Sequence, residues 1–205
     1  MLLDYLDRPT NQSPVVRNLS SLKASVVLRN KYLAHELFCI HGHFMPLKYR
    51  WLRVHGEKNF VVWLRDPIER AASHYYYWIR DYDPKTAGSL RRRVVEERWS
   101  LERFCFSSEM KNIYSSFFWG FPVSRFDFIG ITENYESDLN YFAEYFLHHR
   151  LRVSEINVNS GKTAPRYIED KDLRTRLEKF HDRDMKLYRK ALLDSNSRKK
   201  NSDLP

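Results

Sequence analysis

The feature that most constrains the fold is an apolar run that ends in a helix-start signal. Residues 59–64 read Asn-Phe-Val-Val-Trp-Leu, a run that is typical of a strand covered on both faces in a parallel sheet. Directly after it, Asp66 is a favourable N-cap, Pro67 suits the first helical position, and Glu69 suits a reciprocal cap. The segment therefore predicts a strand, a tight turn and a helix over residues 60–80.

Further strands and helices alternate along the chain. Residues 126–131 (Phe-Asp-Phe-Ile-Gly-Ile) predict a second buried strand, followed by an amphipathic helix to about residue 149. Residues 38–40 predict a short strand. The other expected elements are helices over 21–37, 89–106 and 168–193, a helix or turn over 48–54, and loops over 81–88 and 156–166; residues 112–122 receive no assignment. This alternation argues for an α/β fold.

The length and the apolar content predict one compact domain. The chain has 205 residues, of which 42% are hydrophobic, enough for a core but not for two ordinary domains. We expect an irregular lead-in over residues 1–20, the domain over 21–194, and a polar, disordered tail over 195–205.

The charge balance and the cysteines narrow the possible classes of function. Lys and Arg number 35 against 26 Asp and Glu, and the net charge of +9 should attract phosphate, sulfate, nucleic acid or acidic polysaccharide. Two distant cysteines, Cys39 and Cys105, exclude a disulfide framework and a four-sulfur zinc site, so a reducing compartment is expected. No stretch resembles a membrane span or a signal peptide, which predicts a cytoplasmic chain as given.

One anion site can be predicted from spacing alone. Arg65 follows the predicted strand and faces the free N–H groups of the next helix, where ligands collect in open α/β sheets. Ser73 lies about two turns after Asp66, so Arg65 and Ser73 could hold one phosphate or sulfate. Alternatively, Arg65 pairs with Asp66 or Glu69, and Ser73 is only a small packing residue. Both interpretations stay open at this point.

Three ordered segments resemble one enzyme family. Residues 62–70 (Val-Trp-Leu-Arg-Asp-Pro-Ile-Glu-Arg) with 73–77 (Ser-His-Tyr-Tyr-Tyr) resemble the 3′-phosphate-binding strand and helix of sulfotransferases that use 3′-phosphoadenosine 5′-phosphosulfate. The likeness is closest to the heparan sulfate 2-O-sulfotransferase type and its bacterial relatives. Residues 41–44 (His-Gly-His-Phe) and 128–134 agree with it. The resemblance implies a P-loop-type parallel sheet, flanked by helices, around the nucleotide.

The resemblance also implies roles for individual residues. Arg65 and Ser73 would bind the 3′-phosphate of the cofactor, whose product is adenosine 3′,5′-bisphosphate. His43, or its neighbour His41, would be the general base that deprotonates the acceptor hydroxyl. The acceptor would be a carbohydrate, and this transfer needs no metal. Without the resemblance, a His-X-His segment would more often cap a strand end. The two histidines could also bind a metal ion, but no acidic or cysteine cluster stands nearby to complete such a site.

Two basic segments are further candidates. Residues 160–163 (Ser-Gly-Lys-Thr) lack the earlier glycine and the preceding strand of a phosphate loop. By resemblance, Lys162 and Arg166 could belong to a basic loop that closes over the cofactor, and a solvated loop is the alternative. Arg91, Arg92 and Arg93 are a hypothesis for acceptor contact, with a solvated helix face as the alternative.

One family feature has no counterpart in this sequence. The family begins with a strand and a Lys-Thr loop that holds the 5′-phosphosulfate, and nothing in residues 1–40 matches it. We therefore expect a sheet without this strand and loop, and an inactive sulfotransferase-like remnant is an open alternative. If an upstream anchor exists, the expected location becomes the Golgi lumen or membrane.

A nucleic-acid-binding module is the alternative from another class. The net charge, the arginines at 91–93 and the many aromatic residues favour it. No helix-turn-helix, RNP-like or zinc pattern accompanies them, so nucleic acid is not the expected partner. The sequence does not indicate an oligomeric state.

Overall fold

The computed structural model of this chain describes residues 2–4, 13–32, 39–149, 151 and 166–202. Over these ranges the protein is mixed α/β, with many helices and few, short strands, which confirms the predicted α/β class. None of the described helices is long and apolar enough to cross a membrane.

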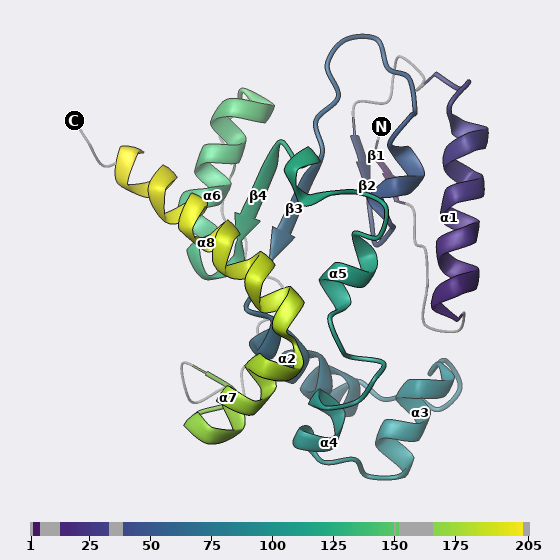
Figure 1. Cartoon of the computed structure of the whole chain (residues 1–205), viewed down its shortest axis with the longest axis vertical. Helices are drawn as coiled ribbons and strands as arrows, with labels where there is room; N and C mark the ends of the chain where they lie inside the picture. Colours follow the sequence, from purple (N-terminus) through teal and green to yellow (C-terminus); the bar gives the residue numbers. More distant parts are fainter. Residues whose placement is uncertain (1, 5–12, 33–38, 150, 152–165, 203–205) are drawn as a thin grey trace.

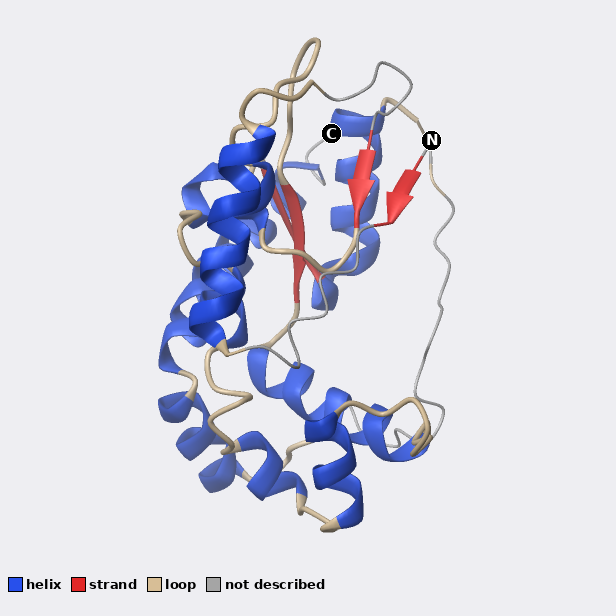
Figure 2. Ribbon diagram, turned by 90° about the vertical axis from the view of Figure 1, so that its right-hand side faces the viewer, coloured by secondary structure: helices blue, strands red, loops and turns tan. Residues whose placement is uncertain are grey.

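The described strands form two separate parallel pairs. Strand β3 (Val61–Leu64) pairs with β4 (Phe128–Ile131), so that Val61 faces Phe128 and Leu64 faces Ile131. Strand β1 (Leu2–Asp4) pairs with β2 (Cys39–His41). Figures 1 and 2 show the two pairs lying side by side in one half of the molecule. The strands predicted near residues 38–40, 60–64 and 126–131 are confirmed.

Helices surround the β3–β4 pair and form the other half of the molecule. They are α1 (Pro14–Leu28), α2 (Pro67–Arg80), α3 (Ser89–Glu96), α4 (Leu101–Cys105), α5 (Ile113–Phe117), α6 (Tyr135–Phe142), α7 (Lys171–Phe180) and α8 (Asp182–Ser202). Short helical turns occur at η2 (Pro46–Tyr49), η3 (Val123–Arg125) and η4 (Thr132–Asn134), and a π-helical turn, η5 (Ala143–Leu147), follows α6. Helices α6 and α8 lie against β4, whereas α2, α3, α4 and α7 gather below the strands in Figure 1.

Two apolar clusters form the core. The larger one joins α2, α3, α4, α7 and the start of α8, and includes Ile68, Phe104 and Leu177. The smaller one packs α8 against the strands and contains Leu64 and Ile131 of the strands with Tyr188 and Ala191 of the helix. Because β3 leads directly into α2, the two clusters meet where the strand ends. This junction positions the candidate site.

The predicted start of α2 is confirmed in its main feature. The Asp66 carboxylate accepts hydrogen bonds from the backbone N–H groups of Ile68 at 2.9 Å and Glu69 at 3.1 Å. The reciprocal cap expected from Glu69 does not form. Glu133, which follows β4, accepts the Asp66 N–H at 2.9 Å, and Glu69 instead accepts the N–H of Tyr167 at 3.0 Å. Glu133, at the end of the neighbouring strand, thus supplies the carboxylate that Glu69 of the helix was expected to supply.

The predictions for the first residues need correction. In the described part of residues 1–20, the chain is not an irregular lead-in, because Leu2–Asp4 forms β1 and α1 begins at Pro14. The proline starts this helix, and the Ser13 hydroxyl caps it by accepting the Val16 N–H at 3.3 Å. A strand therefore does precede the first helix, contrary to expectation, and the helix predicted over 21–37 lies earlier in the chain.

The predicted tail also needs correction. Residues 195–202 are the last turns of α8 and not a disordered tail, because Ser195 is buried and Arg198 reaches Asp138 at 3.1 Å. The helices predicted over 89–106 and 168–193 are each two helices. The first pair is divided near Arg98, which has a φ of 50°, and the second at His181.

Candidate functional site

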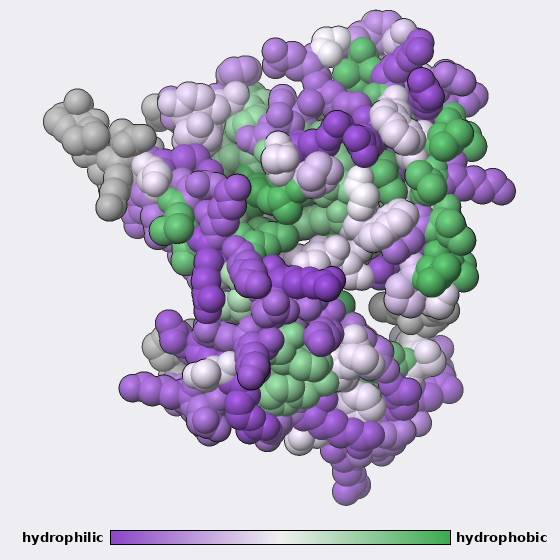
Figure 3. Space-filling model, in the orientation of Figure 1, coloured by the Kyte–Doolittle hydropathy of each residue, from purple (hydrophilic) through white to green (hydrophobic). Residues whose placement is uncertain are grey.

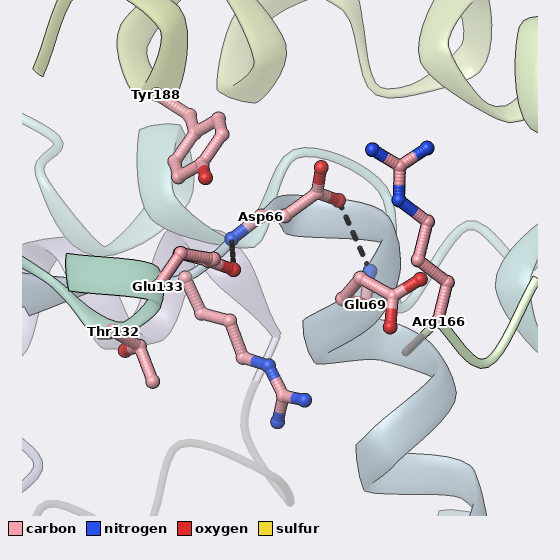
Figure 4. Close-up of a pocket in the computed structure, with 7 residues that line it drawn as sticks. Asp66, Glu69, Thr132, Glu133, Arg166 and Tyr188 are labelled. Carbon is pink, nitrogen blue, oxygen red and sulfur yellow. Dashed lines mark hydrogen bonds between the residues drawn. The ribbon is translucent and has the colours of Figure 1, made fainter. Parts of the chain in front are cut away.

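A cavity of about 250 Å³ lies where β3 and β4 end and α2 begins. Parallel sheets place ligands at this edge, outside the carboxyl ends of their strands. In Figure 4, Asp66 and Glu69 project from the first turn of α2, while Tyr188 reaches in from α8. The lining residues are Arg65, Asp66, Glu69, Thr132, Glu133, Arg166 and Tyr188.

Arg174 on α7 neutralises two of the cavity's carboxylates. Its guanidinium lies 2.5 Å from the Asp66 carboxylate and 3.6 Å from that of Glu69. The three side chains are only 15%, 11% and 8% exposed, so this network is shielded from water. The same arginine also contacts Glu178 at 3.3 Å. Asp66 and Glu69 are thus paired with a residue that the sequence did not indicate.

Arg65 is held by its backbone, which leaves its side chain available. Its N–H donates to the Tyr114 hydroxyl at 3.0 Å, and the same hydroxyl donates to the Arg65 carbonyl at 3.1 Å. The guanidinium carbon lies 5.8 Å from the ring centroid of Tyr167. Within the described ranges, Arg65 forms no ion pair. The alternative that it pairs with Asp66 or Glu69 is therefore wrong.

Arg166 lines the same cavity as Arg65, so the structure brings these two predicted cofactor residues together. No ion pair of Arg166 occurs in the part of the chain that the structure describes. Two cations that have no carboxylate partner among the described residues thus line one cavity. Either guanidinium could hold a phosphate or sulfate, because an arginine fork matches the oxygens of these anions.

Ser73 and the histidines lie elsewhere. Ser73 is half-buried on α2 and does not line the cavity. His41 ends β2, and His43 follows it; both are exposed. His43 is close enough to α2 to act on His74, whose pKa is lowered to about 4 by burial and by the charges of Arg70, Arg91 and His43. The structure therefore brings His43 toward α2 but not into the cavity.

The remaining predicted residues divide into two groups. Lys162 lies outside the described residues. The three arginines of α3 line no part of the cavity, and each has a partner within the protein. Arg91 donates to the Trp78 carbonyl at 3.1 Å, Arg92 donates to the Pro84 carbonyl at 2.8 Å, and Arg93 pairs with Glu109.

Several residues of the cavity were missed by the sequence reasoning. Thr132 and Glu133 directly follow β4, as Arg65 follows β3, and the same rule about strand ends could have found them. The Thr132 hydroxyl donates to the Leu64 carbonyl at 3.0 Å and so ties the two strand ends together. Tyr188 comes from α8, and no local pattern marks it. Burial and the neighbouring Glu133 raise its pKa, so its hydroxyl stays protonated.

The described residues hold no group of three or more side chains that could bind a metal ion. Comparisons of this chain with models of protein families, with curated proteins and with solved structures gave no match. The sulfotransferase resemblance therefore rests on the motifs of residues 41–44, 62–77 and 128–134.

Proposed function

We propose that this chain is a sulfotransferase-type domain with a P-loop-type sheet. It would bind 3′-phosphoadenosine 5′-phosphosulfate and transfer the sulfuryl group to a hydroxyl. The basic surface favours an acidic carbohydrate as the molecule that carries this hydroxyl. One observation carries the proposal. Arg65 lines a cavity at the start of α2 and has no ion-pair partner in the described ranges, whereas Asp66 and Glu69 are bound to Arg174.

The 3′-phosphate is the ligand group that this cavity suits best. Arg65 and Arg166 each supply a fork of N–H donors, whereas Ser73 on α2 does not line the cavity. The Arg174 network limits the repulsion that Asp66 and Glu69 would otherwise exert on a phosphate. The third acid of the cavity is Glu133, and one of its carboxylate oxygens accepts a hydrogen bond from the Asp66 N–H.

His43 is the proposed base. It is exposed and near α2, whereas His74 is packed 4.5 Å from the Trp78 ring and stays neutral because its pKa is about 4. The donor supplies an activated sulfuryl group. In the transfer, the acceptor oxygen bonds to sulfur, the bond from sulfur to the phosphate oxygen breaks, and the imidazole of His43 takes the hydroxyl proton. Adenosine 3′,5′-bisphosphate is the leaving product.

The proposal assigns no residue to the 5′-phosphosulfate, because the sequence contains no matching Lys-Thr loop. Losing one such stabilising donor costs about two to three orders of magnitude in rate. Nucleotide binding is therefore a sharper test than turnover, and it can be measured on this chain directly.

The test is thermal unfolding with and without adenosine 3′,5′-bisphosphate. At about one hundred times the Kd, the ligand should add about 2.7 kcal/mol of stability, a rise in Tm of roughly 5–10 °C. Arg65→Ala should abolish this rise, and His43→Ala should leave it intact. Adenosine 5′-monophosphate, which lacks the 3′-phosphate, should raise the Tm of the parent chain and of both variants little or not at all.

Lys171→Ala is the matched control, because Lys171 is an exposed cation on α7 that does not line the cavity. A rise that survives in Arg65→Ala would show that the nucleotide binds elsewhere. If the parent chain gives no rise, the chain is a remnant without a nucleotide site. Salt-sensitive binding of unrelated oligonucleotides instead would favour the nucleic-acid alternative.

A further inference from the structure

Helix α1 turns its apolar face outward and its polar face inward. Its only buried residues are Ser21 and Ser25. The exposed face forms the apolar column along α1 at the edge of the molecule in Figure 3. Its members are between 37% and 66% exposed, and they are Val15, Val16, Leu19, Leu22, Val26 and Val27. A helix on a globular protein normally has the opposite arrangement.

Polar contacts fix α1 in this orientation. The Ser21 hydroxyl lies 3.3 Å from the sulfur of Met45, and the Arg17 guanidinium donates to the Ser116 hydroxyl at 2.5 Å. The helix packs on η2 through this polar side. Rotating the apolar face inward would turn Arg17 and Ser21 outward and break both contacts. The apolar face is therefore a lasting surface feature, of the kind that marks an interaction site.

The surroundings of this face are basic and aromatic. We define the α1 lobe as residues 13–32 and 39–56, which contain no Asp or Glu. Tyr32 is 56% exposed and Trp51 is 39% exposed, with Arg53 and Arg50 respectively stacked near their rings. The seven cations of the lobe are Arg17, Lys23, Arg29, Lys31, Lys48, Arg50 and Arg53.

We propose that the α1 lobe docks on the surface of a membrane that contains anionic lipids. Helix α1 would lie in the plane of the interface, with its valines and leucines at the acyl boundary and its lysines and arginines among the lipid phosphates. Exposed Tyr and Trp side chains favour the same interfacial depth. This surface contact is separate from the cavity at Arg65 and does not depend on the proposed function.

The charge of the α1 lobe argues against a second copy of this chain as the partner that covers the apolar face of α1. Two α1 lobes would bring seven cations against seven cations, with no acid on either side to compensate them. An anionic lipid surface has the complementary charge. It also adapts its shape to a single exposed helix, whereas a protein partner needs matching grooves.

The test is co-sedimentation with lipid vesicles. The parent chain should bind vesicles of phosphatidylcholine mixed with phosphatidylserine, should bind phosphatidylcholine alone much more weakly, and should be released by salt. Lys23→Glu with Arg29→Glu should weaken binding by at least about 25-fold, since each basic residue contributes about fivefold. Leu19→Glu with Val26→Glu should abolish it. These side chains are exposed, so the variants should keep the parent Tm.

Leu193→Glu with Lys190→Glu is the matched control, because both residues are exposed on α8, on the opposite side of the molecule in Figure 1. It should bind like the parent. The proposal is overturned if the parent ignores acidic vesicles, or if the α1 variants bind as well as the control. Lipid-free self-association that disappears in Leu19→Glu would overturn it in favour of a second copy.

Discussion

Arg174 decides which charges in the cavity are available to a ligand. By pairing with Asp66 and Glu69, it removes two of the cavity's three acids from competition for the Arg65 guanidinium. A buried ion pair adds little net stability, but removing one member leaves the others uncompensated. Arg65 could be predicted from its place after a strand, whereas Arg174 lies in a helix more than a hundred residues later. No local pattern joins residues so distant, which explains why the sequence indicated Arg65 but not Arg174.

His74 should make the protein less stable in mild acid. In the folded protein its pKa is about 4, because it is buried and lies near Arg70 and Arg91, whereas its ordinary value is 6.5. Between these values the unfolded chain binds more protons, so stability is full above pH 6.5 and falls as the pH drops toward 4. The loss should reach about 3 kcal/mol.

Urea unfolding between pH 4 and pH 7.5 would measure this loss. His74→Gln should remove most of the dependence of the unfolding free energy on pH. Part of the dependence that is left should come from His181, whose pKa is also lowered, mainly by burial. His149→Gln, at an exposed position, should leave the profile unchanged. An identical slope in His74→Gln and in the parent would contradict the assignment.

At the scale of elements, the β3–β4 pair depends on a close approach between Trp63 and Gly130. The two residues face each other in the register, and a Cβ at Gly130 would lie 2.4 Å from the Trp63 ring. The indole is held between Phe128 and Tyr135, at centroid distances of 5.7 and 5.1 Å, so it has little freedom to move away. Gly130→Ala should therefore cost about 1–3 kcal/mol of unfolding free energy.

A double-mutant cycle measured by urea unfolding would isolate this contact. In a Trp63→Val background the indole is absent, so Gly130→Ala should cost much less than it does in the parent. Equal costs in the two backgrounds would show that the alanine acts through backbone flexibility and not through the ring.

The elements that the sequence predicted best are those with local signals. Strand β3, the Asp66 cap and α2 could be recognised because an apolar run meets a capping residue and a proline. The breaks inside the predicted helices 89–106 and 168–193 carry no proline or glycine. At Arg98 the backbone takes a positive φ without the residue type that favours it. Tertiary packing therefore sets these boundaries.

At the scale of the whole molecule, the end of α8 joins parts of the chain that are far apart in sequence. The buried Asp138 carboxylate accepts the Ile131 N–H at 2.7 Å and the Ser195 hydroxyl at 2.8 Å, and Arg198 completes its shell at 3.1 Å. Arg198 also donates to the Ile129 carbonyl at 2.7 Å. The polar composition of residues 195–202 suggested a tail because the partners of Ser195 and Arg198 lie in β4 and α6, far away in the sequence.

A chain that ends at residue 194 should therefore be less stable than one that ends at residue 202. The shorter chain leaves the Asp138 carboxylate buried with only the Ile131 N–H as its partner among these bonds, a loss of about 3–5 kcal/mol. Arg198→Ala in the full chain should show part of this loss, and Lys199→Ala, at an exposed position, should show none. Thermal unfolding of the four proteins measures the difference. Equal Tm values for the two chain lengths would mean that Asp138 finds its partners elsewhere, and that the last turns of α8 do not hold β4 in place.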